Sequence, residues 1–266
     1  GPFAGHRHGP FAGHRHGPFA LHAVLTRVRP AMPLSVSDIV ALHDAAPERW
    51  EEAAARRSGP ASAAVPLPAL DEGTALLRDL VEAEHFANFT IWGLEDEARR
   101  RDGGDAKVAA VKRAIDPWNQ RRNDLMEAID ATLLERFSKV NLQASELHSE
   151  TAGMMIDRLS ILALKIRNMD RIAAEEAAGG GAALAAECEA KARVLRVQRE
   201  DLAGCLAKLL EDFAAGRRHF KSYLQMKSYN DDRLNPVLRA AAGKPAGATA
   251  GEEAGATAGK PGGGGA

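Results

Sequence analysis

Apolar positions recur with the helical period through most of the chain. They return every three or four residues between about residues 71 and 229, and glycines or prolines interrupt the runs. A shorter helix is predicted from Ser35 or Ser37 to about Ala45, because a serine can cap its start and Asp38 complements its dipole. The pattern predicts four long helices after it, at 71–102, 105–137, 149 or 151 to 178, and 182–229.

Glycine and proline mark the joints between these helices. Glycines at 103–104 and 179–181 end the first and third of the long helices. Pro117 lies inside the second, where it either kinks the helix or makes Asp116 a new cap. The three prolines within 58–70 indicate a linker. Short joints between long helices are typical of an antiparallel bundle, so we predict an all-α fold with no strand pair.

The two ends of the chain lack this periodicity. Residues 1–34 begin with a repeated octad, GPFAGHRH, and residues 241–266 are mostly alanine, glycine, lysine and proline. The histidines of the octads could bind a metal, but the glycine and proline content favours a low-complexity tail. Neither end can bury enough apolar surface to offset its chain entropy, so we expect both to be disordered. A single all-α domain is therefore predicted at 35–240, with the linker inside it.

Composition narrows the classes of function. Lys plus Arg number 35 and Asp plus Glu 36, so the chain lacks the positive excess of a basic nucleic-acid binder. No run of about 18 apolar residues exists to cross a membrane. Cys188 and Cys205 lie on one predicted helix too far apart to bridge, so we interpret both as packing residues of a protein in a reducing compartment.

Polar side chains form three stripes when residues are placed around the predicted helices at 100° intervals. The first stripe contains His85, Asn88, Trp92, Glu95, Asp96 and Arg99. The second contains Asp116, Asn119, Gln120, Asn123, Glu127 and Asp130, with Arg122 and Asp124 beside it. The third contains Glu150, Asp157 and Asn168, with Arg158, Ser160 and Lys165 close by.

The third stripe is the most informative, because it interrupts the otherwise apolar segment MMIDRLSILALKI. A helix that is apolar nearly all round is buried, so its charges must be paired or must line a cavity. One interpretation is a buried ion-pair network that fixes helix register. The other is a ligand pocket between three helices. The amides favour the pocket, since simple charge pairing does not require them: Asn88, Asn119, Gln120 and Asn123.

Carboxylates, amides, arginines and one histidine together suit a sugar, a nucleotide or a hydrated divalent ion. We therefore predict a pocket that binds or hydrolyses a phosphorylated small molecule such as a nucleotide or nucleotide sugar, with Mg²⁺ as a candidate ion. The candidate catalytic residues are His85, Asp96 and Asp157. The candidate ligand-binding residues are Asn88, Trp92, Glu95, Arg99, Asp116, Asn119, Gln120, Arg122, Asn123, Asp124, Glu150, Arg158 and Lys165.

Plainer roles compete with these assignments. A lone histidine such as His85 is often a hydrogen-bonded core residue, and Trp92 suits packing as well as the floor of a sugar site. The alternative function is a non-catalytic interaction module that docks to a protein partner or forms a homodimer. In that case the polar stripes would be fully cross-paired and closed to solvent.

Four segments resemble a bacterial family known only as a domain of unknown function: HFANFTIWGLEDEARR, KRAIDPWNQRRNDLMEAID, SETAGMMIDRLSILALKI and YLQMKSYNDDRLNP. The resemblance implies a mostly helical fold and a bacterial, cytoplasmic protein. It also implies an association with cell-surface glycan assembly and a glycosyltransferase as a candidate partner. This sequence departs from the family pattern at two positions. Gly93 stands where histidine is common, and Ala152 stands where the family has a proline before the glycine that is Gly153 here.

Overall fold

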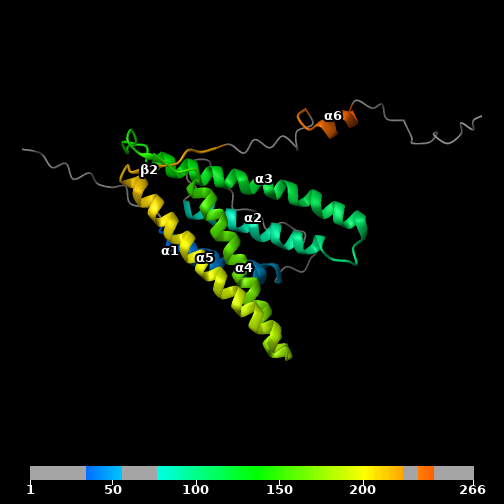
Figure 1. The fold of residues 1–266 in the computed structure, drawn as a ribbon. Helices are drawn as coiled ribbons and strands as arrows, with labels where there is room; N and C mark the ends of the chain where they lie inside the picture. The colour runs from blue at the N-terminus through cyan, green and yellow to red at the C-terminus, as the bar shows by residue number, and fades with distance from the viewer. Residues whose placement is uncertain (1–33, 56–76, 224–232, 243–266) are drawn as a thin grey trace, which may run out of the picture.

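The computed structural model describes residues 34–55, 77–223 and 233–242, and these ranges confirm the all-α class (Figure 1). The predicted tails, the linker at 58–70 and the segment 224–229 fall almost entirely outside them. The helices are α1 (Val36–Ala55), α2 (Leu77–Ala98), α3 (Gly104–Arg136), α4 (Ala152–Gly179), α5 (Ala182–Ala214) and α6 (Pro236–Ala242), and the strands are β1 (Glu146–Leu147) and β2 (Arg218–His219).

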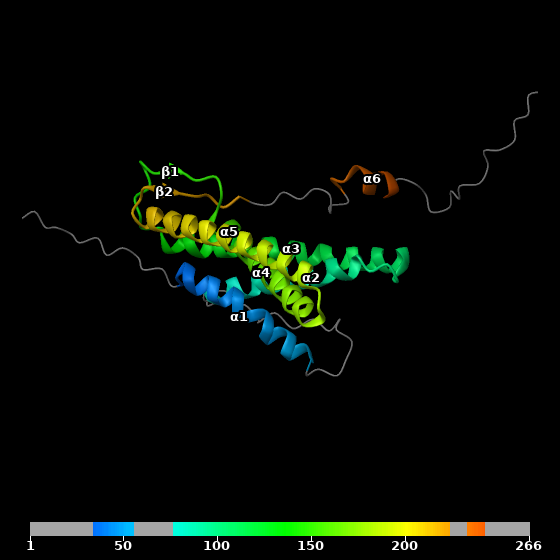
Figure 2. The ribbon, with the colours of Figure 1, turned by 60° about the horizontal axis from the view of Figure 1, so that its bottom comes forward.

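Two helical hairpins make the body of the molecule. Helices α2 and α3 form one hairpin, and α4 and α5 form the other, which crosses it at a steep angle (Figures 1 and 2). Helix α1 packs against α2, α4 and α5 and so covers one side of the crossing. Apolar side chains from all five helices meet there and exclude water from one shared core: Ile39, Leu42, Leu80, Val81, Ile129, Leu133, Ile156, Leu159 and Leu206.

The helix ends follow ordinary capping chemistry. Thr151 is the N-cap of α4, and its side-chain oxygen accepts a hydrogen bond from the backbone N–H of Met154 at 3.2 Å. Gly180 ends the same helix with φ of 87°, a left-handed conformation that glycine adopts without a steric penalty. Of the two starts considered for this helix, the structure has the one capped by Thr151.

Two predicted helix ends are wrong, those of α1 and α5. Helix α1 continues through Pro47 to Ala55 rather than ending near Ala45, because its apolar face stays in the core as far as Pro47. Helix α3 passes through Pro117 without ending there. Helix α5 ends at Ala214 and not at residue 229, since the chain turns at Gly216 with φ of 71°.

That turn allows two features that the apolar pattern did not predict. Phe220 folds back so that its ring packs against Phe213, at 5.1 Å between centroids. Arg218 and His219, which precede Phe220, pair in parallel with Glu146 and Leu147 in the connection between α3 and α4. Strands of two residues are too short to show an alternating pattern, and the expectation of no strand pair is therefore corrected. No helix within the described ranges is both long and apolar enough to span a bilayer.

Candidate functional site

Helices α2, α3 and α4 bring polar side chains together where they cross, and Asn88 is the centre of this cluster. Its Nδ2 donates to Glu84 Oε1 at 2.5 Å, and lies 2.9 Å from both Asp157 Oδ1 and Ser160 Oγ. Arg122 of α3 completes the cluster, with NH1 3.4 Å from Asn88 Oδ1 and Nε 3.6 Å from Asp157 Oδ1. We call these five residues the polar cluster.

Glu84 is fully buried and did not figure among the candidates from the sequence. Burial raises its pKa well above the usual range, and the neighbouring Asp157 carboxylate raises the pKa further. Burial therefore favours the protonated form of Glu84; its Oε1 accepts from Asn88, and its buried Oε2 has no hydrogen-bond partner among the described residues. The sequence did hold a signal for it, because Glu84 lies four positions before Asn88 and thus on the same side of the helix.

His85, a predicted catalytic residue, is buried beside the polar cluster and hydrogen-bonded through both ring nitrogens. Its Nε2 lies 3.0 Å from the carbonyl oxygen of His43, which can only accept, so Nε2 carries the proton. Nδ1 then accepts from the Ser160 hydroxyl at 2.8 Å. Burial lowers the pKa of His85 to about 4. Both ring nitrogens are thus satisfied in a neutral side chain that lies in the core, packed against the ring of Trp50.

The polar cluster reaches solvent on one edge. The side chains of Arg122 and Asp157 are 25% and 12% exposed, whereas the other three members are buried. Arg122 and Asp157 carry opposite charges, and burial disfavours a further charge on Glu84. Arg122 Nε is buried and has the Asp157 carboxylate at 3.6 Å as its nearest acceptor, beyond hydrogen-bond distance. The edge therefore presents a guanidinium beside a carboxylate acceptor, so their opposite charges offset each other.

Further along the α3–α4 contact lies a second polar group, Asp130. Its carboxylate accepts from the backbone N–H of Gly153 at 2.7 Å, in the first turn of α4. Burial raises the pKa of Asp130 to about 6, although this hydrogen bond and one from Thr151 oppose the shift. The cavity beside it has a volume of about 10 Å³, which is room for one water molecule.

The other predicted site residues do not converge on this cluster. Glu95 and Glu150 are half-buried but already paired, the first with Arg99 and Lys112 and the second with Arg158. Asn119 is also half-buried. Beyond the crossing of the hairpins no helix covers these faces, so the outer parts of each stripe face solvent. The exposed members are Asp96, Arg99, Asp116, Gln120, Asp124, Arg158 and Lys165.

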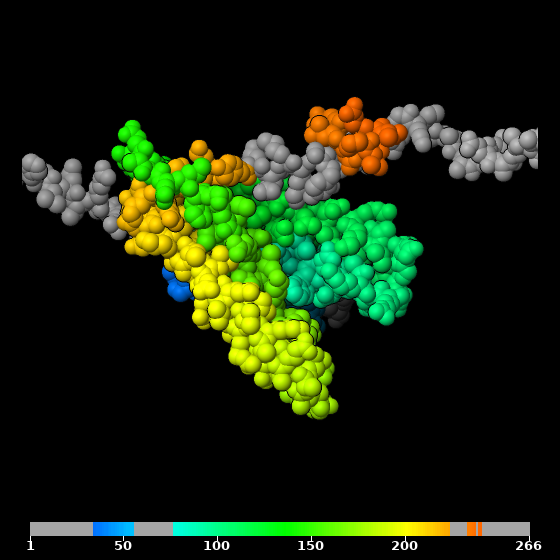
Figure 3. Space-filling view, viewed as in Figure 1, coloured from blue at the N-terminus to red at the C-terminus, as the bar shows by residue number. Residues whose placement is uncertain are grey.

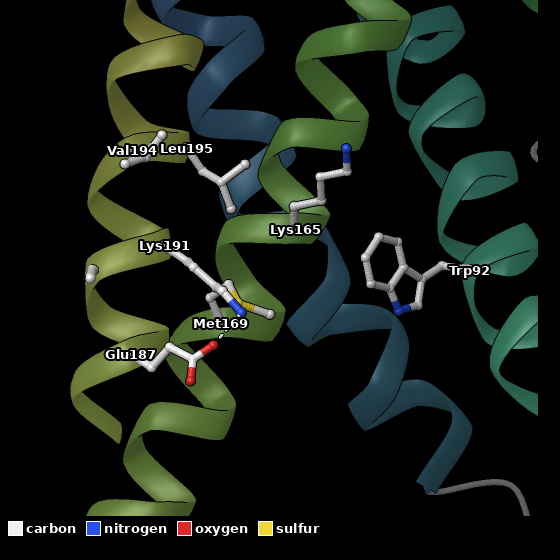
Figure 4. Close-up of a pocket in the computed structure, with 8 residues that line it drawn as sticks. Trp92, Lys165, Met169, Glu187, Lys191, Val194 and Leu195 are labelled. Atoms are coloured by element: carbon white, nitrogen blue, oxygen red, sulfur yellow. Dashed lines mark hydrogen bonds and ion pairs between the residues drawn. The ribbon is translucent and has the colours of Figure 1, made fainter. Parts of the chain in front are cut away.

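Trp92 and Lys165 instead line an open groove of about 520 Å³, further along α2 and α4 from the polar cluster (Figure 4). Trp92 reaches in from α2, Lys165 and Met169 from α4, and Val194 from α5. Apart from the lysine and one ion pair on its rim, the lining is apolar. This groove is therefore a hydrophobic surface and not the predicted polar pocket.

The described residues contain no group of three or more histidine, cysteine, aspartate or glutamate side chains placed to hold a metal ion. Of the cluster carboxyls, Glu84 favours its protonated form and Asp157 is paired with Arg122. A magnesium ion would thus lack the ring of anionic oxygen ligands that it prefers.

A family model described as "Protein of unknown function (DUF4254)" matches residues 78–222, which is more than half of the chain. The match extends from the start of α2 past β2 and so includes every residue of the polar cluster. Neither a curated protein nor a solved structure matches the chain.

Proposed function

The chain belongs to the DUF4254 family, and from its own geometry we propose that it binds the sugar part of a glycan precursor, such as a nucleotide sugar, at the exposed edge of the polar cluster. Asp157 and Arg122 contact the ligand in this proposal. The single observation that carries it is the convergence of five polar side chains from three helices, with Arg122 and Asp157 partly exposed at one edge.

The charge of the edge favours hydroxyl groups over phosphate. Arg122 is compensated by Asp157, so a phosphate placed there would meet the carboxylate as well as the guanidinium. A sugar hydroxyl can accept from Arg122 and donate to Asp157 at the same time. The nucleotide part of the ligand would then lie outside the cluster. This refines the expectation from sequence of a pocket for a phosphorylated small molecule.

Asp157 adds a capacity for proton transfer. Asp157 can accept the proton of a ligand hydroxyl and later return it to the ligand oxygen, while the protonated Glu84 carboxyl beside it keeps its own proton throughout. Asp157 would be the group in contact with the ligand. We propose binding as the primary function and this proton transfer as the chemistry that the site could support, in the cytoplasm of a bacterium.

Thermal unfolding of the full chain tests the proposal with three probes: UDP-glucose, glucose and inorganic phosphate. A ligand that binds only the folded state at 100 times its Kd adds about 2.7 kcal/mol to the free energy of unfolding. We expect UDP-glucose and glucose to raise the Tm and phosphate to leave it unchanged. Asp157→Asn should abolish the sugar-induced shift, because the amide cannot replace the charged acceptor.

Asp96→Asn is the matched control, since it makes the same chemical change on an exposed part of α2. It should keep the full sugar-induced shift. If no sugar raises the Tm, or if Asp157→Asn responds to sugars as strongly as Asp96→Asn does, the polar cluster is not a sugar site.

The groove favours a second candidate function, an interaction module. A concave apolar surface beside Trp92 is suited to the apolar face of a helix from another protein. The family resemblance makes a glycosyltransferase of glycan assembly the candidate partner. Co-expression with such an enzyme tests this: Trp92→Ala should lose a complex that Asp96→Asn retains.

A further inference from the structure

Part of the α4–α5 hairpin stands clear of the rest of the molecule. Its tip projects past the α2–α3 hairpin, and the space-filling view shows an indentation between the two (Figure 3). Several apolar side chains on α5 are exposed here, including Leu184 at 44% and Val194 at 58%. Val194 also lines the groove described above. Exposed apolar side chains next to an apolar groove are typical of an association surface.

These side chains share one face of the helix with a pair of opposite charges. At 100° per residue, Leu184, Glu187, Lys191 and Val194 fall within an arc of about 80°. Lys191 Nζ donates to Glu187 Oε1 at 2.6 Å. The face therefore reads apolar, acidic, basic, apolar along α5, with its midpoint at position 189. We call it the α5 face.

Such an order is complementary to itself when the helix is reversed. In two antiparallel copies related by a twofold axis at position 189, each residue lies opposite the one equally far beyond the midpoint. Leu184 of one copy then faces Val194 of the other, and Glu187 faces Lys191. Both apolar residues gain an apolar neighbour and both charges gain an opposite one. A parallel arrangement would instead place like charges together.

We propose that the α5 face is a homodimer interface, at which α5 of a second copy lies antiparallel in the groove beside Trp92. The reversed helix buries Leu184 and Val194 of both copies and forms a network of four charges at the axis. The second copy also covers Met169, which the groove otherwise leaves half-exposed. This inference rests on the α5 face and the groove, and it is independent of ligand binding at the polar cluster.

A charge-exchange experiment on the full chain tests the interface, with the mass measured by sedimentation over a range of concentrations. The parent chain should show the mass of a dimer. Lys191→Glu places four carboxylates at the axis and should weaken the dimer about tenfold or more. The double variant Glu187→Lys with Lys191→Glu should restore the dimer, because each lysine again faces a glutamate of the partner copy.

Arg193→Glu is the matched control. Arg193 makes a similar ion pair with Glu189, four residues earlier, but both lie on the side of α5 away from the α5 face. This variant should leave the dimer unchanged, and circular dichroism should show that all variants remain helical. A parent chain that stays monomeric overturns the proposal, as does a double variant that remains folded without recovering the dimer. A monomeric chain would leave the groove to a different protein.

Discussion

Asp130 lies in the contact between α3 and α4, where opposing influences act on its pKa. Burial disfavours its charge, while the Gly153 N–H and the Thr151 side chain favour it, and the result is a pKa of about 6. In the unfolded chain the pKa returns to about 3.8. The folded state therefore binds the proton more tightly, so ionisation of Asp130 lowers stability above pH 6, and this cost disappears as the pH falls toward 4.

Asp130→Asn should remove that cost, because the amide oxygen still accepts from Gly153 and carries no charge. At pH 7 we expect the variant to be more stable than the parent by roughly 1 to 3 kcal/mol. The difference should shrink as the pH falls through 6. Urea unfolding at pH 7 and at pH 4.5 measures it, and a difference that is equal at both pH values would contradict the assigned pKa.

Gly153 permits the same contact for a steric reason. A Cβ at this position would lie 2.5 Å from the carbonyl oxygen of Met126, which belongs to the backbone of α3 and cannot rotate away. Gly153→Ala should therefore destabilise the fold by about 2 to 4 kcal/mol. Gly93→Ala is the control, since nothing lies within 4 Å of its Cβ position in α2, and it should gain about 0.5 to 1 kcal/mol. Equal effects in thermal unfolding would refute this explanation.

At the scale of the helices, the sequence was sufficient to predict a helix end where the periodic apolar pattern stops at a capping residue. The start of α4 at Thr151 and its end at Gly180 are visible in the sequence because capping is local. The inward direction of Asn88 and Asp157 was also predictable, since their neighbours are apolar. The exposure of Asp96 and Arg158 was not, because it depends on where another helix stops covering the stripe.

The prolines also show that local sequence does not predict what tertiary packing decides. The sequence left open whether Pro117 kinks its helix or makes Asp116 the cap of a new one; α3 is one helix through Pro117, which lies on an exposed face. Long-range packing of Ile115 and Leu125 on either side outweighs the local preference of one residue. Likewise the end of α5 depends on Phe213 stacking with Phe137, at 4.7 Å between ring centroids, which no local pattern reveals.

Replacing Pro117 with alanine should stabilise the protein. The change restores the missing backbone donor within α3 and removes the ring that opposes helix geometry, for a gain of about 1 to 3 kcal/mol. Pro47→Ala in α1 should gain less, because Pro47 is buried and its ring contributes packing that alanine loses. Urea unfolding of both variants checks the ordering, and a Pro117→Ala variant that is less stable than the parent would show that the ring supports α3.

On the scale of the whole molecule, the question is what holds α1 against the two hairpins. Ion pairs join it to each neighbour: Arg49 with Glu82 at 2.7 Å, Arg199 with Asp44 at 2.6 Å and Arg167 with Glu51 at 2.5 Å. At least one partner in each pair is about half exposed. Surface ion pairs contribute little, so the apolar contacts should dominate.

Ile39→Ala and Arg167→Ala compare the two contributions directly. Ile39 is completely buried in the core, so its truncation should cost about 2 to 4 kcal/mol. Loss of the Arg167 pair should cost less than about 1 kcal/mol and should depend on salt. Denaturant midpoints at low and high salt provide the comparison, and a larger effect for Arg167 would mean that charge, not packing, fastens α1.

The parallel pairing of β1 with β2 has a consequence for the order of events during synthesis. Its two partners are about 70 residues apart, and the later one follows the last turn of α5. While the ribosome is still translating α5, the connection between α3 and α4 has no strand to bind. The α2–α3 hairpin can form early from its own contacts, but the connection between α3 and α4 can be paired only when the chain has emerged beyond His219.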